Sequence, residues 1–173
     1  MAGELIRQWG CYDLTSNSST APHPHLSISQ VPGSWLWGRA FPAAGGVCYG
    51  APFRVPDNAT LATGIKVDLL VVDDGKATTD LGTAVVFGVR LKNVVGGTDG
   101  FSTTDGGPEV VAALTLPGTS GLAKILTVSI PTASLDGIAA GSTGLIQIRR
   151  AAENSGDTCR GRVLLAGVAA YAY

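Results

Sequence analysis

Ile65-Lys66-Val67-Asp68-Leu69 is the stretch that decides the fold class, because its apolar and polar side chains alternate with a period of two. Runs of similar character follow along the chain, at 84–92, 109–116, 124–130, 144–149 and 162–173. They are rich in Val, Ile, Leu and Thr and bounded by Gly, Asp or Pro, which is typical of strands separated by turns. The one helical candidate is a single turn within 132–140. Short strands without crossover helices predict an all-β fold, an antiparallel sandwich or barrel.

The first 60 residues differ in composition from the rest of the chain. They hold all three tryptophans, both histidines and six of the nine prolines, and they show little periodicity. We therefore predict two regions. The first is an extended N-terminal arm at 1–52, with one or two short strands near 26–30 and 34–40, and the second is a β-sandwich domain at 53–173.

The tryptophans of this arm are the predicted interaction residues. Indole rings are large apolar groups, so Trp9, Trp35 and Trp37 are expected to lie against a partner or against the sandwich. Alternation places Trp35 and Trp37 on one face of a strand, where they could also form a platform for stacking sugars. A docking arm further predicts that deletion of residues 1–45 leaves a folded sandwich that no longer binds its partner.

Length and charge exclude several classes of protein. A chain of 173 residues suits one domain. Twelve Lys and Arg against thirteen Asp and Glu give a net charge of −1, whereas nucleic-acid binding proteins show a basic surplus or stripe. No stretch approaches the roughly 20 apolar residues of a membrane-spanning helix. We therefore expect no nucleic-acid partner and no membrane segment.

The cysteines indicate a reducing compartment. Cys11, Cys48 and Cys159 are odd in number and widely spaced, which fits neither a disulfide framework nor a metal-binding CxxC pair. We expect them to be buried or half-buried free thiols. Residues 1–7 lack a basic segment followed by an apolar run, so we expect no secretory signal and synthesis in the cytoplasm.

Residue types that carry catalysis or bind metals are scattered. His23 and His25 have no third ligand nearby, so we expect solvated imidazoles; a metal shared across a trimer axis is the alternative. No G-x-S-x-G elbow is present for a nucleophilic serine. Asp73-Asp74-Gly75 and Asp99-Gly100 lack the ligand spacing of a calcium loop and predict turns. We therefore expect no enzymatic activity, no cofactor and no metal.

A structural role is predicted for three polar residues near the C-terminus. Asp157 and Thr158 lie in a predicted turn, where their side chains can hydrogen-bond to the backbone and shape the connection between two strands. Arg149 ends the preceding strand and could form a bidentate ion pair with Asp157. We expect this pair to fix the loop.

The order of segments in residues 53–173 resembles a known family. Gly64-Ile65-Lys66-Val67 opens a strand, Leu145-Ile146-Gln147-Ile148-Arg149-Arg150 precedes the Asp157-Thr158 turn, and the last strand ends at Tyr173. This order is similar to that of small jelly-roll structural proteins of tailed-phage virions, which often pair an I-x-R strand with a D-T-x-x-G turn. The chain departs from the family at Phe87, where the family often has Trp.

The resemblance implies a jelly-roll-like sandwich and a non-enzymatic role in a bacteriophage virion. The expected function is a capsid decoration, or cement, protein that is made in the host cytoplasm. It would form a trimer and clamp neighbouring subunits of the major capsid protein, or another virion protein. The 14% of charged residues is low for a free monomer and agrees with this role.

Two other functions stay open. The first is a carbohydrate- or receptor-binding module of a tail or fibre, which would use loops 73–82 and 96–108 with Trp35 and Trp37. The second is a small secreted bacterial β-sandwich, against which the absent signal and the unpaired cysteines weigh.

Overall fold

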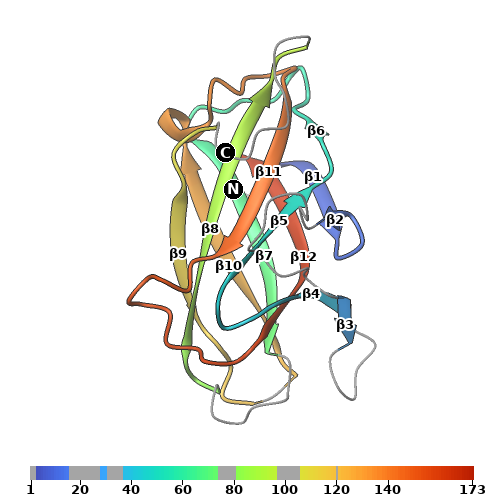
Figure 1. The fold of residues 1–173 in the computed structure, drawn as a ribbon. Coiled ribbons are helices and arrows are strands. Elements are labelled where there is room, and N and C mark those ends of the chain that lie inside the picture. Colours follow the sequence, from blue (N-terminus) through green and yellow to red (C-terminus); the bar gives the residue numbers. More distant parts are fainter. Residues whose placement is uncertain (1–2, 16–27, 31–36, 74–80, 97–105, 120) are drawn as a thin grey trace.

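Two antiparallel β-sheets form the protein and pack face to face as a sandwich (Figure 1). The computed structural model describes residues 3–15, 28–30, 37–73, 81–96, 106–119 and 121–173. The strands are β1 (Glu4–Gly10), β2 (Leu14–Thr15), β3 (Ile28–Gln30), β4 (Trp37–Phe41), β5 (Gly46–Gly50), β6 (Phe53–Arg54), β7 (Gly64–Asp73), β8 (Ala84–Val94), β9 (Val110–Thr115), β10 (Ala123–Pro131), β11 (Thr143–Arg150) and β12 (Val163–Ala172). A short 3₁₀ turn, η2 (Thr132–Ser134), lies where the helical turn was expected. Within the described ranges, no helix is long and apolar enough to cross a membrane.

Eight of the strands form nested pairs, which is the arrangement of a jelly roll. β4 pairs with β12, β5 with β11, β7 with β10 and β8 with β9, so the first strand of the set lies beside the last. One sheet has the order β10-β7-β12-β4 and the other the order β9-β8-β11-β5. A long hairpin rolled up in this way gives two Greek keys in two sheets. The predicted all-β, antiparallel, jelly-roll-like sandwich is confirmed.

The remaining four strands, β1, β2, β3 and β6, have two to seven residues and complete the two sheets. β1 pairs with β12 and β3 with β4 in one sheet, while β2 pairs with β5 and β6 with β11 in the other. Strands do lie near 26–30 and 34–40, as expected, but the described residues of 1–52 are not an arm outside the sandwich. The reason is the nested pairing, since without β4 and β5 the strands β12 and β11 would each lack a neighbour.

The core lies between the sheets, where alternate residues of each strand point inward. In β11 the buried positions include Gly144, Ile146 and Ile148, and the residues between them are half-buried. Phe87 of β8 meets Phe41 of β4 edge to face, with 5.4 Å between the ring centroids. Phe41 is therefore the aromatic partner of Phe87 in the core.

Trp9 of β1 belongs to this core. Its side chain is fully buried, its Nε1 donates to the carbonyl oxygen of Ala51 at 2.8 Å, and its ring packs edge-on against Phe53. Gly50 leaves room for the indole, because a Cβ there would lie 3.0 Å from Trp9 Nε1. Trp9 therefore lies against the sandwich itself and not against a partner, which is one of the two positions expected for it, because its place opposite the buried Val168 of β12 directs it inward.

Candidate interaction surface

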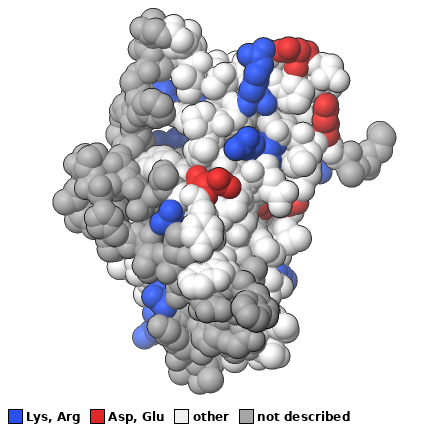
Figure 2. Space-filling view, turned by 90° about the vertical axis from the view of Figure 1, so that its right-hand side faces the viewer, with Lys and Arg blue, Asp and Glu red and all other residues white. Residues whose placement is uncertain are grey.

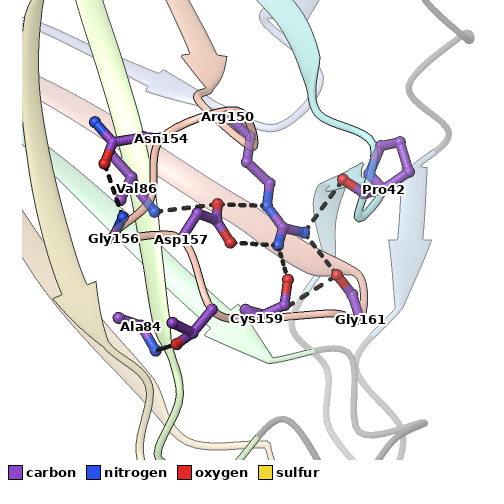
Figure 3. A network of polar contacts seen from close by, with 10 residues as sticks. Pro42, Ala84, Val86, Arg150, Asn154, Gly156, Asp157, Cys159 and Gly161 are labelled. Atoms are coloured by element: carbon purple, nitrogen blue, oxygen red, sulfur yellow. Dashed lines mark hydrogen bonds and ion pairs between the residues drawn. The ribbon is translucent and has the colours of Figure 1, made fainter.

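A buried arginine closes one end of the sandwich (Figure 3). The side chains of Arg150 and Asp157 are 0% and 1% exposed. Arg150 Nε donates to Asp157 Oδ2 at 2.9 Å and Nη2 donates to Oδ1 at 2.8 Å, which makes a bidentate ion pair. Its remaining N–H groups donate to the carbonyl oxygens of Pro42, Cys159 and Gly161. All five N–H groups of the guanidinium therefore have an acceptor, and the β4–β5 turn is tied to the β11–β12 connection.

Asp157 and Thr158 also hold this connection against β8. Asp157 Oδ2 accepts the backbone N–H of Val86 at 3.3 Å, and Thr158 Oγ1 accepts the backbone N–H of Ala84 at 3.0 Å. The carbonyl oxygen of Ala84 in turn accepts the N–H groups of Thr158 and Cys159 at 2.9 Å. These bonds fix the path of the chain between β11 and β12, which is the structural role expected of both residues.

Burial and ion pairing act on Arg150 in opposite directions. Burial by itself lowers the pKa of the guanidinium, because the charged form loses its hydration. The hydrogen bonds and the charge of Asp157 outweigh this effect, so the pKa of Arg150 lies above its ordinary value. Arg150 therefore keeps its positive charge in the buried network.

The predicted pairing of Arg149 with Asp157 is wrong by one residue. Ile146 and Ile148 point into the core, so the next inward position of β11 is Arg150 and not Arg149. The spacing of Ile146 and Ile148 in the sequence already indicates that Arg150, two residues further on, points inward. The chemistry expected of the pair, a bidentate bond that fixes the loop, belongs to Arg150.

Arg149 makes a second ion pair, on the outer face of the sheet that contains β11, β8 and β9. Its Nε and Nη2 donate to the two carboxylate oxygens of Glu109 at 2.5 and 2.7 Å, and its Nη1 contacts Glu153. The hydrogen bonds that Arg149 donates to Glu109 are the main reason that the pKa of Arg149 is raised, and the bond that it donates to Glu153 lowers the pKa of Glu153. Glu109 precedes β9 and Arg149 lies on β11, so the pair bridges across β8.

Gly88 of β8 lies beneath this bridge. A Cβ at Gly88 would be 2.4 Å from Glu109 Oε1, so Glu109 must move if the glycine is replaced. We expect Gly88→Ala to lower the free energy of unfolding by about 1 kcal/mol, the value of a partly exposed ion pair. Urea denaturation measures the change. In a Glu109→Ala background the same substitution should cost nothing further, and an undiminished cost there would contradict the assignment.

The other two tryptophans have different outcomes. Trp37 begins β4 and is 41% exposed, and Tyr12 in the β1–β2 turn is 68% exposed. Arg39 of β4 donates from Nε to the carbonyl oxygen of Cys11 at 3.0 Å, so this turn lies beside β4. Trp35 lies outside the described residues, so the prediction that Trp35 and Trp37 form a platform for stacking sugars stays a prediction. Trp37 and Tyr12 are therefore aromatic side chains available on one side of the sandwich.

The cysteines are free and buried, as expected. Burial raises the pKa of Cys48 to about 12 and also raises the pKa of Cys11. Because the thiolate is the reactive form, both thiols are poor nucleophiles at neutral pH. Cys159 lies in the β11–β12 connection beside the Arg150 network.

Several candidate positions for metal or ligand binding fall outside the described residues. These are His23, His25 and most of the loops 73–82 and 96–108. Asp73, which is described, is buried, and its Oδ2 accepts the backbone N–H of Gly121 at 3.2 Å. Across the described ranges, no three His, Cys, Asp or Glu side chains are grouped as metal ligands.

One side of the sandwich is formed by two edge strands, β9 in one sheet and β10 in the other, which lie close to one another (Figure 1). Within the described residues each of them pairs with one strand, β9 with β8 and β10 with β7. We call β9 and β10 together the open side. Large apolar side chains are exposed there, namely Val111 on β9, Ile125 on β10 and Leu122 just before β10. Ile125 is the most exposed of the three, at 58%. The open side therefore combines free strand edges with apolar surface.

The hydrogen bonds at Gly64, the first residue of β7, show in which direction the backbone N–H and C=O groups of β10 point. Gly64 and Tyr173 exchange two N–H···O bonds, so Gly64 directs its backbone groups toward β12. Because this direction alternates along an antiparallel strand, Ile65 directs its groups toward β10 and bonds to its partner Ile130. Every second residue of β10 before Ile130 pairs with β7 in the same way.

The residues between them direct their N–H and C=O groups away from β7. They are Ile125, Thr127 and Ser129, whose side chains are exposed and uncharged. Within the described part of the chain these backbone groups have no partner. Lys124 is the one charged residue of β10, and its Nζ donates to the carbonyl oxygen of Thr115 on β9 at 3.1 Å. The edge of β10 is thus a regular row of hydrogen-bonding groups flanked by uncharged side chains.

A scan against protein-family models finds no match, and a search of curated proteins finds none. The fold and the open side of the sandwich are therefore the features that support a function for this chain.

Proposed function

We propose that the chain is a non-enzymatic virion structural protein, a capsid decoration protein whose copies associate with one another and dock on capsid subunits. The observation that carries this proposal is the uncharged edge of β10 on the open side. Monomeric proteins protect edge strands with charges, prolines, bulges or a covering segment, because free edges recruit other chains. Between Ile125 and Ser129 the edge of β10 has no charged residue and no proline.

The fold supports the setting of the proposal. The nested pairing of β4 with β12 through β8 with β9 is a jelly roll, the fold of the virion proteins that the chain resembles. Six of its eight strands lie in residues 53–173, which carry the resemblance, and β4 and β5 precede them. A trimer, the unit expected from that resemblance, belongs to the proposal. Each copy would contribute a small apolar contact, and repetition over many copies makes the sum large.

The side opposite the open side is the proposed docking surface for the capsid. Figure 2 views the molecule from the side where β2 and β3 lie in Figure 1, and its described surface is mostly uncharged, with scattered charged side chains. Trp37 and Tyr12 are exposed aromatic residues from β4 and from the turn before β2. Aromatic residues dominate the binding energy of many protein interfaces.

Co-sedimentation with virion shells assembled without this chain tests the proposal. The full chain is expected to bind the shells and to remain with them through washing. Trp37→Ser should weaken binding about 30-fold, because truncating a central interface aromatic costs about 2 kcal/mol. Val111→Ser, on the open side, serves as the control and should bind shells like the parent chain.

Two outcomes would contradict the proposal. A full chain that does not sediment with shells is not a decoration protein. Equal loss of binding in Trp37→Ser and Val111→Ser would remove the assigned docking surface. Binding to purified glycans in place of shells would favour the recognition module instead.

A further inference from the structure

We infer that β10 pairs with β10 of a second copy of this chain, antiparallel and about a two-fold axis at Thr127, so that one sheet continues across both molecules. This inference names the partner of the open side and rests on the self-association in the proposed function. It specifies a contact, a register and a symmetry that the proposed function leaves open.

The regularity of β10 makes such pairing possible. β10 pairs with β7 over nine consecutive residues, Ala123 to Pro131, without a register shift. The pairings of β12 with β1 and with β7, in contrast, each contain an irregularity. A bulge twists an edge away from a neighbour, and β10 has none. Its backbone groups therefore lie in one straight row.

The centre of the strand fixes the register. Thr127 is the middle residue of Ala123–Pro131, so an axis through it overlaps the two strands completely. Thr127 is also one of the residues whose N–H and C=O face the open side, so Thr127 and its symmetry mate exchange two N–H···O bonds. In the same register Ile125 lies opposite Ser129 of the second copy, and these two residues exchange two further N–H···O bonds. By symmetry, Ser129 and Ile125 of the second copy form the same pair.

Charge favours a second copy as the occupant. Two identical edges repel when like charges lie opposite one another. Lys124 is the charged residue of β10, and in this register it lies opposite Ile130 of the second copy, about 20 Å along the strand from the other Lys124. Asp68 of β7 lies next to β10, and its Oδ1 accepts a hydrogen bond from the Thr127 hydroxyl at 2.6 Å. The self-pair therefore brings no like charges together.

The edge of β9 is less suited to the same contact. β9 has six residues against nine in β10, so it offers a shorter row. One of its open-side groups, the carbonyl oxygen of Thr115, already accepts a hydrogen bond from Lys124 Nζ. The contact between copies is accordingly assigned to β10.

Cross-linking of the full chain tests this register. Thr127→Cys is treated with a short bifunctional thiol reagent that spans about 5 Å, the Cβ separation of opposite residues. We expect a covalent dimer on a denaturing gel. Ile125→Cys is the matched control, because two cysteines at this position would be about 14 Å apart and beyond the reagent. The parent chain reports the background, which should be low because its thiols are buried.

The outcomes separate the inference from the proposed function. A dimer band from Thr127→Cys and none from Ile125→Cys supports the two-fold register. No band from Thr127→Cys, or equal bands from both variants, overturns it. Shell binding without cross-linking would leave the proposed function standing and remove this contact, whereas cross-linking without shell binding would do the reverse. The double variant Ile125→Cys/Ser129→Cys gives an independent reading, because its two positions meet only between copies and should cross-link.

Discussion

Asp157→Ala is expected to lower the free energy of unfolding by about 3–5 kcal/mol, because it leaves the Arg150 guanidinium buried without its counter-charge. Arg150 is fully buried and cannot turn to water. The substitution also removes the acceptor of the Val86 N–H, so the start of β8 loses a bond as well. For a chain of this length the melting temperature should fall by about 10 °C or more, which differential scanning calorimetry measures.

The exposed ion pair Arg54–Asp57 provides the matched control. Its side chains are 64% and 78% exposed, and Asp57 lies on the surface. Asp57→Ala should change the free energy of unfolding by about 0–1 kcal/mol, because water screens such a pair. Equal losses in Asp57→Ala and Asp157→Ala would show that the Arg150 network has no special weight.

A double substitution should fail to rescue the loss at Asp157. Replacing both members of a buried ion pair by apolar residues is often neutral, since no charge is left unpaired. Arg150 also donates to the carbonyl oxygens of Pro42, Cys159 and Gly161, however, and these would lose their donor in Arg150→Met/Asp157→Leu. Arg150 therefore stabilises the fold through three backbone carbonyl groups as well as through its ion pair with Asp157.

Trp9→Ala is the second substitution with a large expected effect. It should lower the free energy of unfolding by about 3–5 kcal/mol, because it empties a fully buried indole site and removes the bond to the Ala51 carbonyl. Trp37→Ala is the control. Trp37 is 41% exposed, and its removal should cost about 1 kcal/mol or less. Denaturant titration followed by far-ultraviolet circular dichroism measures both.

Deletion of residues 1–45 is expected to prevent folding, in contrast to the prediction from the sequence. The deletion removes β1 and β4, which pair with β12, and it also removes Trp9 and Phe41 from the core. The truncated chain is therefore expected to be unfolded or insoluble. A folded, soluble product would contradict the place of these strands in the sandwich and would restore the separate arm.

The sequence predicts the long strands well and the short ones poorly, for a physical reason. β7 and β8 have 10 and 11 residues, enough for buried and half-buried residues to alternate over Ile65–Val71 of β7 and Val89–Lys92 of β8. β2, β4 and β5 have two to five residues, so no period can be read from them. β4 and β5 find their partners far along the chain, on β12 and β11, where Ala40 lies opposite Leu164 and Cys48 lies opposite Ile148.

The site residues divide in the same way. Alternation along β11 is local, so the choice of Arg150 over Arg149 was within reach of the sequence. The burial of Trp9 depends on Gly50, Ala51 and Phe53, which no local pattern connects to it. The open side could not be predicted, because a strand becomes an edge only through the order of the whole sheet.

The mass of the full chain in solution, measured by light scattering over a range of concentrations, tests the central claim that this protein works by assembling with copies of itself. The account predicts a particle of two chains, or of six where the trimer also forms. Three chains would support the trimer and contradict the β10 contact. A single chain at every concentration would contradict self-association altogether.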